Sequence, residues 1–192
     1  MKTIKEEIRN EIEIKNSRFI TLLIPLETNN INELLKNIKE SYPKATHYCY
    51  AYIFGKEQGF SDDGEPSRTA GSPMYNVLEK EELNNILAVT IRYFGGIKLG
   101  AGGLVRAYTK SLTEALKQAT LQDLIEAYKV KITFDYKDEK QIHYLLGESP
   151  ILEKDYSSTP TYITIIEKND IEKFYPYSYE ILEDCYKKID SK

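Results

Sequence analysis

Apolar and polar positions along the first 120 residues form two kinds of pattern. Isoleucines alternate with polar residues near the N-terminus, and the run FITLLIPL follows, which together indicate two strands. Apolar residues recur at helical spacing in NNINELLKNIKESY, where Asn30 and Glu33 are placed like the partners of a helix cap. The patterns predict strands at 6–15, 18–26, 47–55 and 85–93, and helices at 29–42, 73–81 and 103–119.

Two loops interrupt this pattern. The first, KEQGFSDDGEPSRTAGSP, has a glycine and proline content that disfavours regular structure until about Ser72. The second lies inside RYFGGIKLGAGGLVRAY, between the buried strand at 85–93 and the helix at 103–119. Five of the ten glycines of the chain fall in this second stretch, between Arg92 and Arg106.

The last third of the chain has a different character, because nine of the sixteen tyrosines follow Glu126. Its pattern predicts the order βαββαβ of a small ferredoxin-like domain. The predicted elements are strands at 128–136, 151–157 and 160–168, helices at 138–147 and 170–175, and a final segment at 179–187 that fits either a strand or a helix. We therefore predict an α+β chain with domains at 1–125 and 126–192.

Composition and cysteine usage narrow the class of protein. With 41% hydrophobic and 29% charged residues, the chain can form a packed core. No apolar run approaches the roughly 18 residues of a membrane span, and the start MKTIKEEIRNEIEIK has charges where a signal peptide is apolar. Cys49 and Cys185 form no CxxC pair, which favours two reduced thiols over a disulfide or a zinc site. We expect a cytoplasmic protein without a membrane partner.

Charge is distributed unevenly. Residues 126–192 contain ten Lys and fourteen Asp or Glu, so the net charge of −4 lies entirely in this part. Acidic surfaces repel phosphate backbones, which argues against binding of DNA or RNA by charge alone. In the neutral remainder, no acidic residue occurs between Glu82 and Glu114. This window contains four cations, namely Arg92, Lys98, Arg106 and Lys110.

The glycine-rich loop is typical of an anion site, because it precedes a helix whose first N–H groups lack intrahelical acceptors. Glycines would let the backbone approach the anion closely. A phosphate or sulfate ion, or the phosphate of an RNA, is the expected occupant. The candidate binding residues are Arg92, Gly95, Gly96, Lys98, Gly100, Gly102, Gly103 and Arg106. The sequence fits neither a nucleoside-triphosphate loop nor a dinucleotide fingerprint, and glycines that serve only a tight turn remain an alternative.

The other charged loop also opens a helix, so the two loops are expected to form two walls of one site. The possible wall residues are His47, Asp62, Asp63, Glu65, Arg68 and Thr69. Arg92 has an alternative role in this arrangement, as the internal ion-pair partner of Glu65 or Asp63.

The stretches ATHYCYAY, DDGEPSRTAGSPM and LAVTIRYFGGIKLGAGGLVRAY, in this order, resemble the IMPACT family in its bacterial YigZ-like branch. The resemblance covers about residues 15 to 120, and the tail is similar to the ferredoxin-like domain of many bacterial members. It implies an N-terminal domain with the ribosomal-protein domain 2-like fold, expected as a mixed sheet with helices on one face. Eukaryotic members regulate translation through the kinase that senses uncharged tRNA, but they use an additional N-terminal region that is not expected here.

The family pattern falls on positions in both loops and on the strands that lead to them. They are His47, Asp63, Gly64, Glu65, Pro66, Thr69, Ala70, Gly71, Arg92, Gly95, Gly96, Lys98, Leu99, Gly100, Gly103, Arg106 and Tyr108. Arg68 departs from the pattern, because the resemblance implies a glycine there.

Enzyme chemistry finds less support than binding. Some family members are labelled proline dipeptidases, but a dinuclear metal site needs more ligands than His47, His143 and an acidic turn supply. His47 and Cys49, two positions apart on a strand, are about 6.6 Å apart along it, too far for a catalytic pair. We expect no metal, no cofactor and no catalytic residue. The favoured interpretation is a translation-associated regulator that binds the ribosome, RNA or a translation factor; the alternative is a small-molecule hydrolase.

Overall fold

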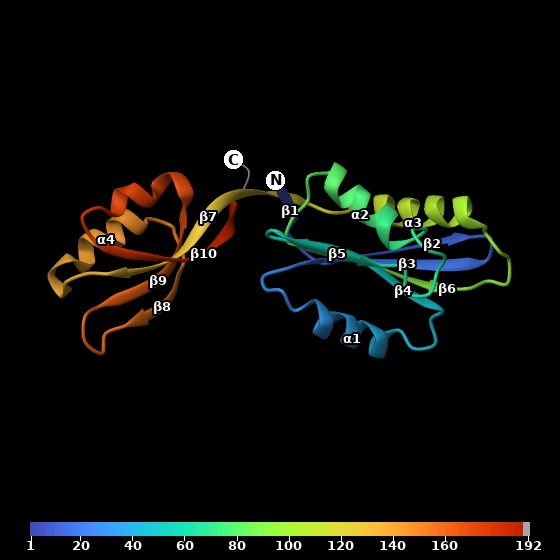
Figure 1. Ribbon diagram of the computed structural model, residues 1–192, viewed down its shortest axis with the longest axis horizontal. Coiled ribbons are helices and arrows are strands. Elements are labelled where there is room, and N and C mark those ends of the chain that lie inside the picture. The colour runs from blue at the N-terminus through green and yellow to red at the C-terminus, as the bar shows by residue number, and fades with distance from the viewer. Residues whose placement is uncertain (190–192) are drawn as a thin grey trace. The chain divides into compact units, whose positions relative to one another are not determined.

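The computed structural model describes residues 1–189, and the chain divides into two compact units, Met1–Asp123 and Leu124–Lys192 (Figure 1). Helices and antiparallel strands alternate without a parallel βαβ pattern in either unit, which confirms the predicted α+β class. The expected division after residue 125 falls within strand β7 (Leu121–Thr133) and stays a prediction.

The first unit is built on a five-stranded sheet in the order β2-β3-β6-β4-β5. Its strands are β2 (Ile8–Ile14), β3 (Ser17–Pro25), β4 (His47–Phe54), β5 (Glu57–Ser61) and β6 (Ile86–Tyr93). Its helices are α1 (Ile31–Ser41), α2 (Gly71–Lys80) and α3 (Ala101–Leu116). A short strand, β1 (Lys2–Ile4), pairs outside this sheet with the first residues of β7.

Two details of the expected N-terminal fold are wrong. Every strand pairing in the sheet is antiparallel rather than mixed, and helices cover both faces (Figure 1). Helix α1 packs on one face, while α2 and α3 pack on the other. The physical reason is visible in β6, whose residues alternate between the two cores: Ala88 belongs to one and Val89 to the other. A strand buried on both faces needs a helix layer on each.

Two local expectations also differ from the structure. Strand β5 occupies the start of the segment expected to be a loop, because Gly55, at a φ of 60°, turns the chain back so that β5 pairs with β4. As the edge strand of the sheet, β5 is polar and lacks the apolar signature of a strand. Asn30 precedes α1 as expected, but its side chain forms no capping hydrogen bond.

The second unit has the predicted ferredoxin-like element order. Strand β7 pairs with both β9 (Thr161–Glu167) and β10 (Ser178–Ile189), and β9 pairs with β8 (Ile151–Asp155). A short 3-10 turn, η1 (Tyr136–Asp138), precedes α4 (Glu139–Leu146), and the second expected helix is the 3-10 helix η2 (Lys168–Phe174). The final segment, open in the sequence, is a strand. Within residues 1–189, no helix has the length and apolar character needed to cross a bilayer.

Candidate site at the start of helix α3

Three of the five glycines in the glycine-rich stretch are required by the backbone. A Cβ on Gly95 would lie 2.0 Å from the carbonyl oxygen of Asn16, so the loop presses directly on the turn between β2 and β3. Gly96 and Gly100 have φ values of 85° and 71°, in the left-handed region that glycine adopts without steric cost. A Cβ on Gly102, by contrast, would meet nothing within 4 Å. The packing interpretation accounts for the first three but not for Gly102.

The N–H groups at the start of α3 lack internal acceptors. Helical hydrogen bonding begins with the N–H of Leu104, which donates to the carbonyl oxygen of Gly100 at 2.9 Å. The N–H groups of residues 101–103 donate to no other group within residues 1–189, and the N-cap residue Gly100 has no side chain to receive them. They lie at the positive end of the helix dipole. The backbone at this end can therefore accept an anion.

Two cations flank these amides in the sequence. Lys98 and Arg106 are both exposed, and neither forms an ion pair or a side-chain hydrogen bond with another residue of the described chain. The same loop exposes two apolar side chains, Phe94 at 46% and Ile97 at 45%. Our sequence reasoning missed these two, although a phenylalanine and an isoleucine within a glycine-rich polar loop are a readable signal of a contact surface.

The start of α2 is arranged differently, because a carboxylate already occupies it. Asp62 Oδ1 accepts hydrogen bonds from the N–H groups of Ala70 and Gly71, both at 2.9 Å, and its Oδ2 accepts one from the N–H of Arg68 at 2.7 Å. A carboxylate at a helix start satisfies the free amides and the dipole together. Asp62 therefore has a structural role, and of the starts of α2 and α3 it is that of α3 that remains open.

Asp63 and His47 join this loop to the end of β4. Asp63 Oδ2 accepts a hydrogen bond from the N–H of Tyr48 at 2.7 Å. The carbonyl oxygen of Asp63 lies 2.8 Å from His47 Nδ1, and because a carbonyl can only accept, Nδ1 carries the proton. The other ring nitrogen, Nε2, faces Glu65 Oε2 at 3.8 Å. His47 thus positions the loop from the sheet side.

Glu65 and Arg92 form a buried ion pair, which corrects the assignment of Arg92 to the anion-binding group. Arg92 Nη1 donates to Glu65 Oε1 at 2.5 Å, and the two side chains are 5% and 4% exposed. Tyr108 donates to the same carboxylate oxygen at 2.8 Å. Arg92 Nη2 donates to Ser17 Oγ at 3.3 Å. The guanidinium is therefore internal, and the ion pair with Glu65 that the sequence left open is the one that forms.

This cluster joins the first loop to the strand and the helix on either side of the glycine-rich loop. Glu65 comes from the first loop, Arg92 from the end of strand β6, and Tyr108 from the second turn of α3. Burial raises the pKa of Tyr108, so its hydroxyl keeps the proton that it donates to Glu65. The first loop is therefore held against the two elements that flank the glycine-rich loop by a structural ion pair, and the formation of one binding site by both loops stays a prediction.

Cys49 belongs to the core and is no nucleophile. Its side chain is fully buried, and its thiol donates to the carbonyl oxygen of Asp62 at 3.0 Å. Burial raises the pKa of the thiol to about 12, with a smaller opposing effect from the hydrogen bond to Tyr108. A thiol with this pKa remains protonated near neutral pH and cannot attack a substrate.

The departure at Arg68 has a backbone explanation. Arg68 has a φ of 62°, a conformation that suits glycine and strains most other residues. Thr69, the next residue, is buried and donates from Oγ1 to the carbonyl oxygen of Pro66 at 2.6 Å, which holds the turn in place. The glycine expected from the family pattern is therefore the residue that this backbone favours.

Replacing Arg68 with glycine is expected to leave the free energy of unfolding unchanged or to raise it by up to about 1 kcal/mol, because the left-handed backbone loses its strain. Arg68→Ala is the matched control, since it removes the same side chain but keeps a Cβ. Denaturant titration of both variants should place Arg68→Gly about 1 kcal/mol above Arg68→Ala. Equal stability of the two would contradict the backbone explanation.

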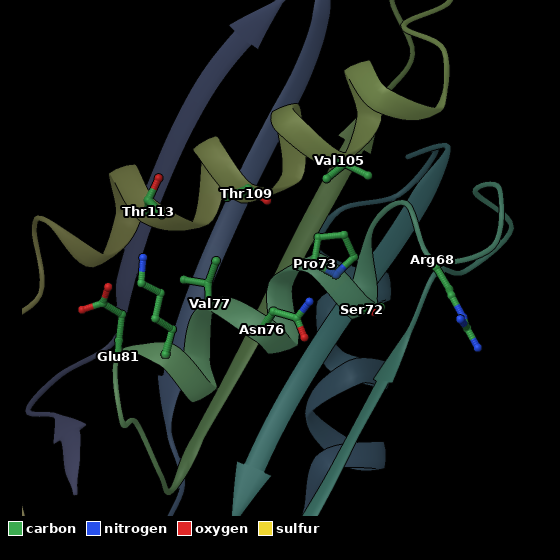
Figure 2. Close-up of a pocket in the computed structure, with 10 residues that line it drawn as sticks. Arg68, Ser72, Pro73, Asn76, Val77, Glu81, Val105, Thr109 and Thr113 are labelled. Carbon is green, nitrogen blue, oxygen red and sulfur yellow. The ribbon is translucent and has the colours of Figure 1, made fainter.

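A groove of about 490 Å³ lies between α2 and α3, with the N-terminal ends of both helices at the same end (Figure 2). Its lining consists of Arg68, Ser72, Pro73, Asn76, Val77, Lys80, Glu81, Val105, Thr109 and Thr113. Figure 2 shows Arg68 at one end with its side chain directed away from the helices. The sequence reasoning missed this groove, although Val105, Thr109 and Thr113 follow each other at helical spacing. Its one carboxylate, Glu81, lies at the end opposite Arg68 (Figure 2).

The second histidine lies in the other unit. His143 Nε2 is 3.2 Å from the hydroxyl of Tyr162, which donates to Glu139 Oε1 at 2.5 Å. The exposed Tyr156 donates to the same oxygen at 2.6 Å, and these two hydrogen bonds, that of Tyr156 foremost, lower the pKa of Glu139. Within residues 1–189, no three side chains of His, Cys, Asp or Glu come together as metal ligands.

Comparison with known proteins relates both parts of the chain to one family. Residues 15–116 match the Impact N-terminal domain. The chain is 40% identical to the IMPACT family member YvyE of Bacillus subtilis (strain 168), over 93% of its length and 85% of the relative. It is 38% identical to the IMPACT family member YigZ of Escherichia coli (strain K12), over 76% of each chain.

A solved structure extends the likeness to the whole fold. A crystal structure of a hypothetical protein superposes with a TM-score of 0.72 at 31% identity, over 95% of this chain and 97% of the other. The domain match, the extent of the two curated relatives and the motifs in both loops agree, and the chain belongs to the IMPACT family.

Proposed function

We propose that this protein is a translation-associated regulator that contacts the phosphate groups of ribosomal RNA through the start of α3. The observation that carries the proposal is the set of unsatisfied N–H groups at residues 101–103, flanked in the sequence by two exposed cations without partners among the described residues. Its connection with translation rests on the family, through the resemblance to translation regulators. We call residues 94–106 the contact loop.

The chemistry of the contact loop suits a phosphate group. Backbone amides at a helix start point toward a bound anion, and the helix dipole favours negative charge. Lys98 and Arg106 add charge without a competing carboxylate, because residues 83–113 contain no Asp or Glu. The absence of a Cβ at Gly102 leaves room for a phosphate to reach the amides.

The exposed apolar residues of the loop supply a second kind of contact. Phe94 can stack on an unpaired base, which contributes about 1 to 3 kcal/mol per base in known complexes. Ile97, three residues after Phe94 in the same loop, offers a further exposed apolar side chain. A loop with both phosphate and base contacts favours exposed single-stranded or looped RNA over regular duplex.

The proposed contact is local, and its dependence on salt should reflect this. Only two free cations lie in the contact loop, and residues 126–192 carry the whole net negative charge. The slope of log affinity against log salt should therefore be about −1 to −2, much shallower than that of a protein covering many phosphates.

Lys98→Ala and Arg106→Ala should each weaken co-sedimentation with ribosomes and reduce the magnitude of the salt slope by about one. The measurement is a sedimentation series from low to moderate salt with the purified full chain. Lys140→Ala, an exposed lysine on α4, is the matched control and should bind as the wild type does. Ribosomal RNA stripped of its proteins should retain the difference between the variants.

Three results would overturn the proposal: no binding at low salt, equal binding of all variants, or binding to intact ribosomes that is lost with stripped RNA. The last outcome would identify a ribosomal protein as the contact. If the partner is instead a translation factor, the protein should bind that factor in the absence of both intact ribosomes and stripped ribosomal RNA.

The hydrolase alternative gains no supporting observation. Glu65, the carboxylate that would act as an acid or base, has one oxygen held by Arg92 and Tyr108 and is 4% exposed. Cys49 is protonated and buried. We therefore propose no second function.

A further inference from the structure

Strand β10 is an edge of the sheet in the second unit. It extends over twelve residues, Ser178–Ile189, and pairs with β7 along one side. No strand within residues 1–189 pairs with its other side. A strand edge of this kind presents a row of N–H and C=O groups that can pair with another chain.

The first half of β10 lacks two of the usual protections of an edge strand, because it contains no proline and its side chains are exposed rather than covered. All residues from Ser178 to Asp184 are exposed, on both faces of the strand. Three of them are large and apolar, with Tyr179 at 39%, Ile181 at 48% and Leu182 at 42% exposed. No proline interrupts the strand. Such a combination favours pairing with another strand.

The charges along β10 select one partner and one orientation. Its first half carries Glu180, Glu183 and Asp184, and its second half carries Lys187 and Lys188. Parallel pairing of two copies in register would place like charges side by side. Antiparallel pairing would place the acidic half of each copy beside the basic half of the other. Opposite charges across a strand pair are favourable, and like charges are unfavourable.

We propose that β10 pairs antiparallel with β10 of a second copy of this chain, centred on Cys185, to form a symmetric dimer. In this register Glu183 lies opposite Lys187 of the second copy, and Ile181 lies opposite Ile189. The twofold symmetry forms each of these pairs twice. The paired segment, residues 181–189, lies within the strand as the structure has it.

The intrachain contacts of β10 place the relevant side chains on one face. Glu183 forms an ion pair with Lys129 Nζ at 3.4 Å, and Lys187 Nζ forms one with Glu167 Oε1 at 3.1 Å. Positions 183, 185 and 187 alternate with the opposite face, so Cys185 lies between the two charges. The Glu183 side chain remains 59% exposed and is accessible to a second cation.

The dimer should be weak, since one strand pair is smaller than a standard interface. A dissociation constant of about 10 to 100 µM is expected. Sedimentation velocity over a concentration series should show a monomer that converts reversibly to a dimer. Glu183→Lys and Lys187→Glu should each raise the dissociation constant about tenfold or more, because each turns two attractive pairs into repulsive ones.

The double variant, Glu183→Lys with Lys187→Glu, should restore the dimer. It restores opposite charges across the two copies, but within each chain it places a lysine at 183 beside Lys129 and a glutamate at 187 beside Glu167, which are like-charge contacts. Recovery of the dimer would therefore come from the interface and not from the intrachain ion pairs. Circular dichroism verifies that each variant is folded. Glu148→Lys, the same charge change at an exposed position in the loop after α4, should dimerise as the wild type does.

Cys185 provides an independent test. Cys49 is fully buried, so a short bismaleimide should link two wild-type chains through Cys185 alone. Cys185→Ser should abolish the covalent dimer. The proposal is wrong if the chain stays monomeric throughout the series, if Glu183→Lys leaves the dimer unchanged, or if the folded double variant stays monomeric.

Discussion

Replacing Glu65 with alanine is expected to lower the free energy of unfolding of the first unit by about 3 to 5 kcal/mol. The substitution removes the partner of Arg92, whose side chain is 5% exposed, and leaves a buried positive charge uncompensated. It also leaves the buried hydroxyl of Tyr108 without its acceptor. This penalty exceeds that of an ordinary surface substitution, which is usually within about 0.5 kcal/mol.

The measurement must report on the first unit, because two units can unfold in separate transitions. Native-state hydrogen exchange of the β4 and β6 amides, which form the centre of the first sheet, does so. The control is a double-mutant cycle that consists of Glu65→Ala, Arg92→Met and the double variant carrying both substitutions. Since the double variant removes both charges, it should be more stable than the sum of the two single effects predicts. Strict additivity would show that the ion pair does not act as a unit.

Replacing Gly95 with alanine should destabilise the first unit by about 3 kcal/mol or prevent its folding. The new Cβ would lie 2.0 Å from the carbonyl oxygen of Asn16 and 2.5 Å from the N atom of Ser17. Both are backbone atoms, which cannot move aside as the end of a flexible side chain can. The N–H of Gly95 also donates a hydrogen bond to Ser17 Oγ at 3.1 Å. A backbone displaced by the new Cβ would lose this hydrogen bond.

Gly102→Ala is the matched control for this substitution. Gly102 lies in the first turn of α3, with open space around its added Cβ. Alanine there should leave stability unchanged or raise it by up to about 1 kcal/mol, since glycine is the poorer helix former. Thermal unfolding should therefore show a lower melting temperature for Gly95→Ala and an unchanged or higher one for Gly102→Ala. A destabilising Gly102→Ala would mean that the five glycines share one packing role.

The Gly102 control also separates structure from function at the contact loop. If a phosphate reaches the amides of residues 101–103, the added methyl group should weaken ribosome binding although the fold is intact. Packing alone predicts no such loss. Combined with the Lys98 and Arg106 variants, this experiment distinguishes a backbone anion site from a pair of surface charges.

Local pattern alone determined much of this protein. The α+β class, most strands and helices of the first unit and the element order of the second unit were readable from periodicity and breaker residues. These features depend on neighbours in the sequence, and hydrophobic burial enforces them wherever the chain folds. The polar edge strand β5 was not readable, because an edge strand has little apolar signal of its own.

Tertiary structure decided what the site residues do. The sequence showed Glu65 as a charge on a loop and Arg92 as a charge at the end of a strand, but only the packing of α3 and β6 brings them together as a buried ion pair. It equally decided that Asp62 closes the start of α2 while the start of α3 stays open. The reason is physical: the partner of a polar group depends on which distant residue lies within hydrogen-bond distance, and no local pattern contains that information.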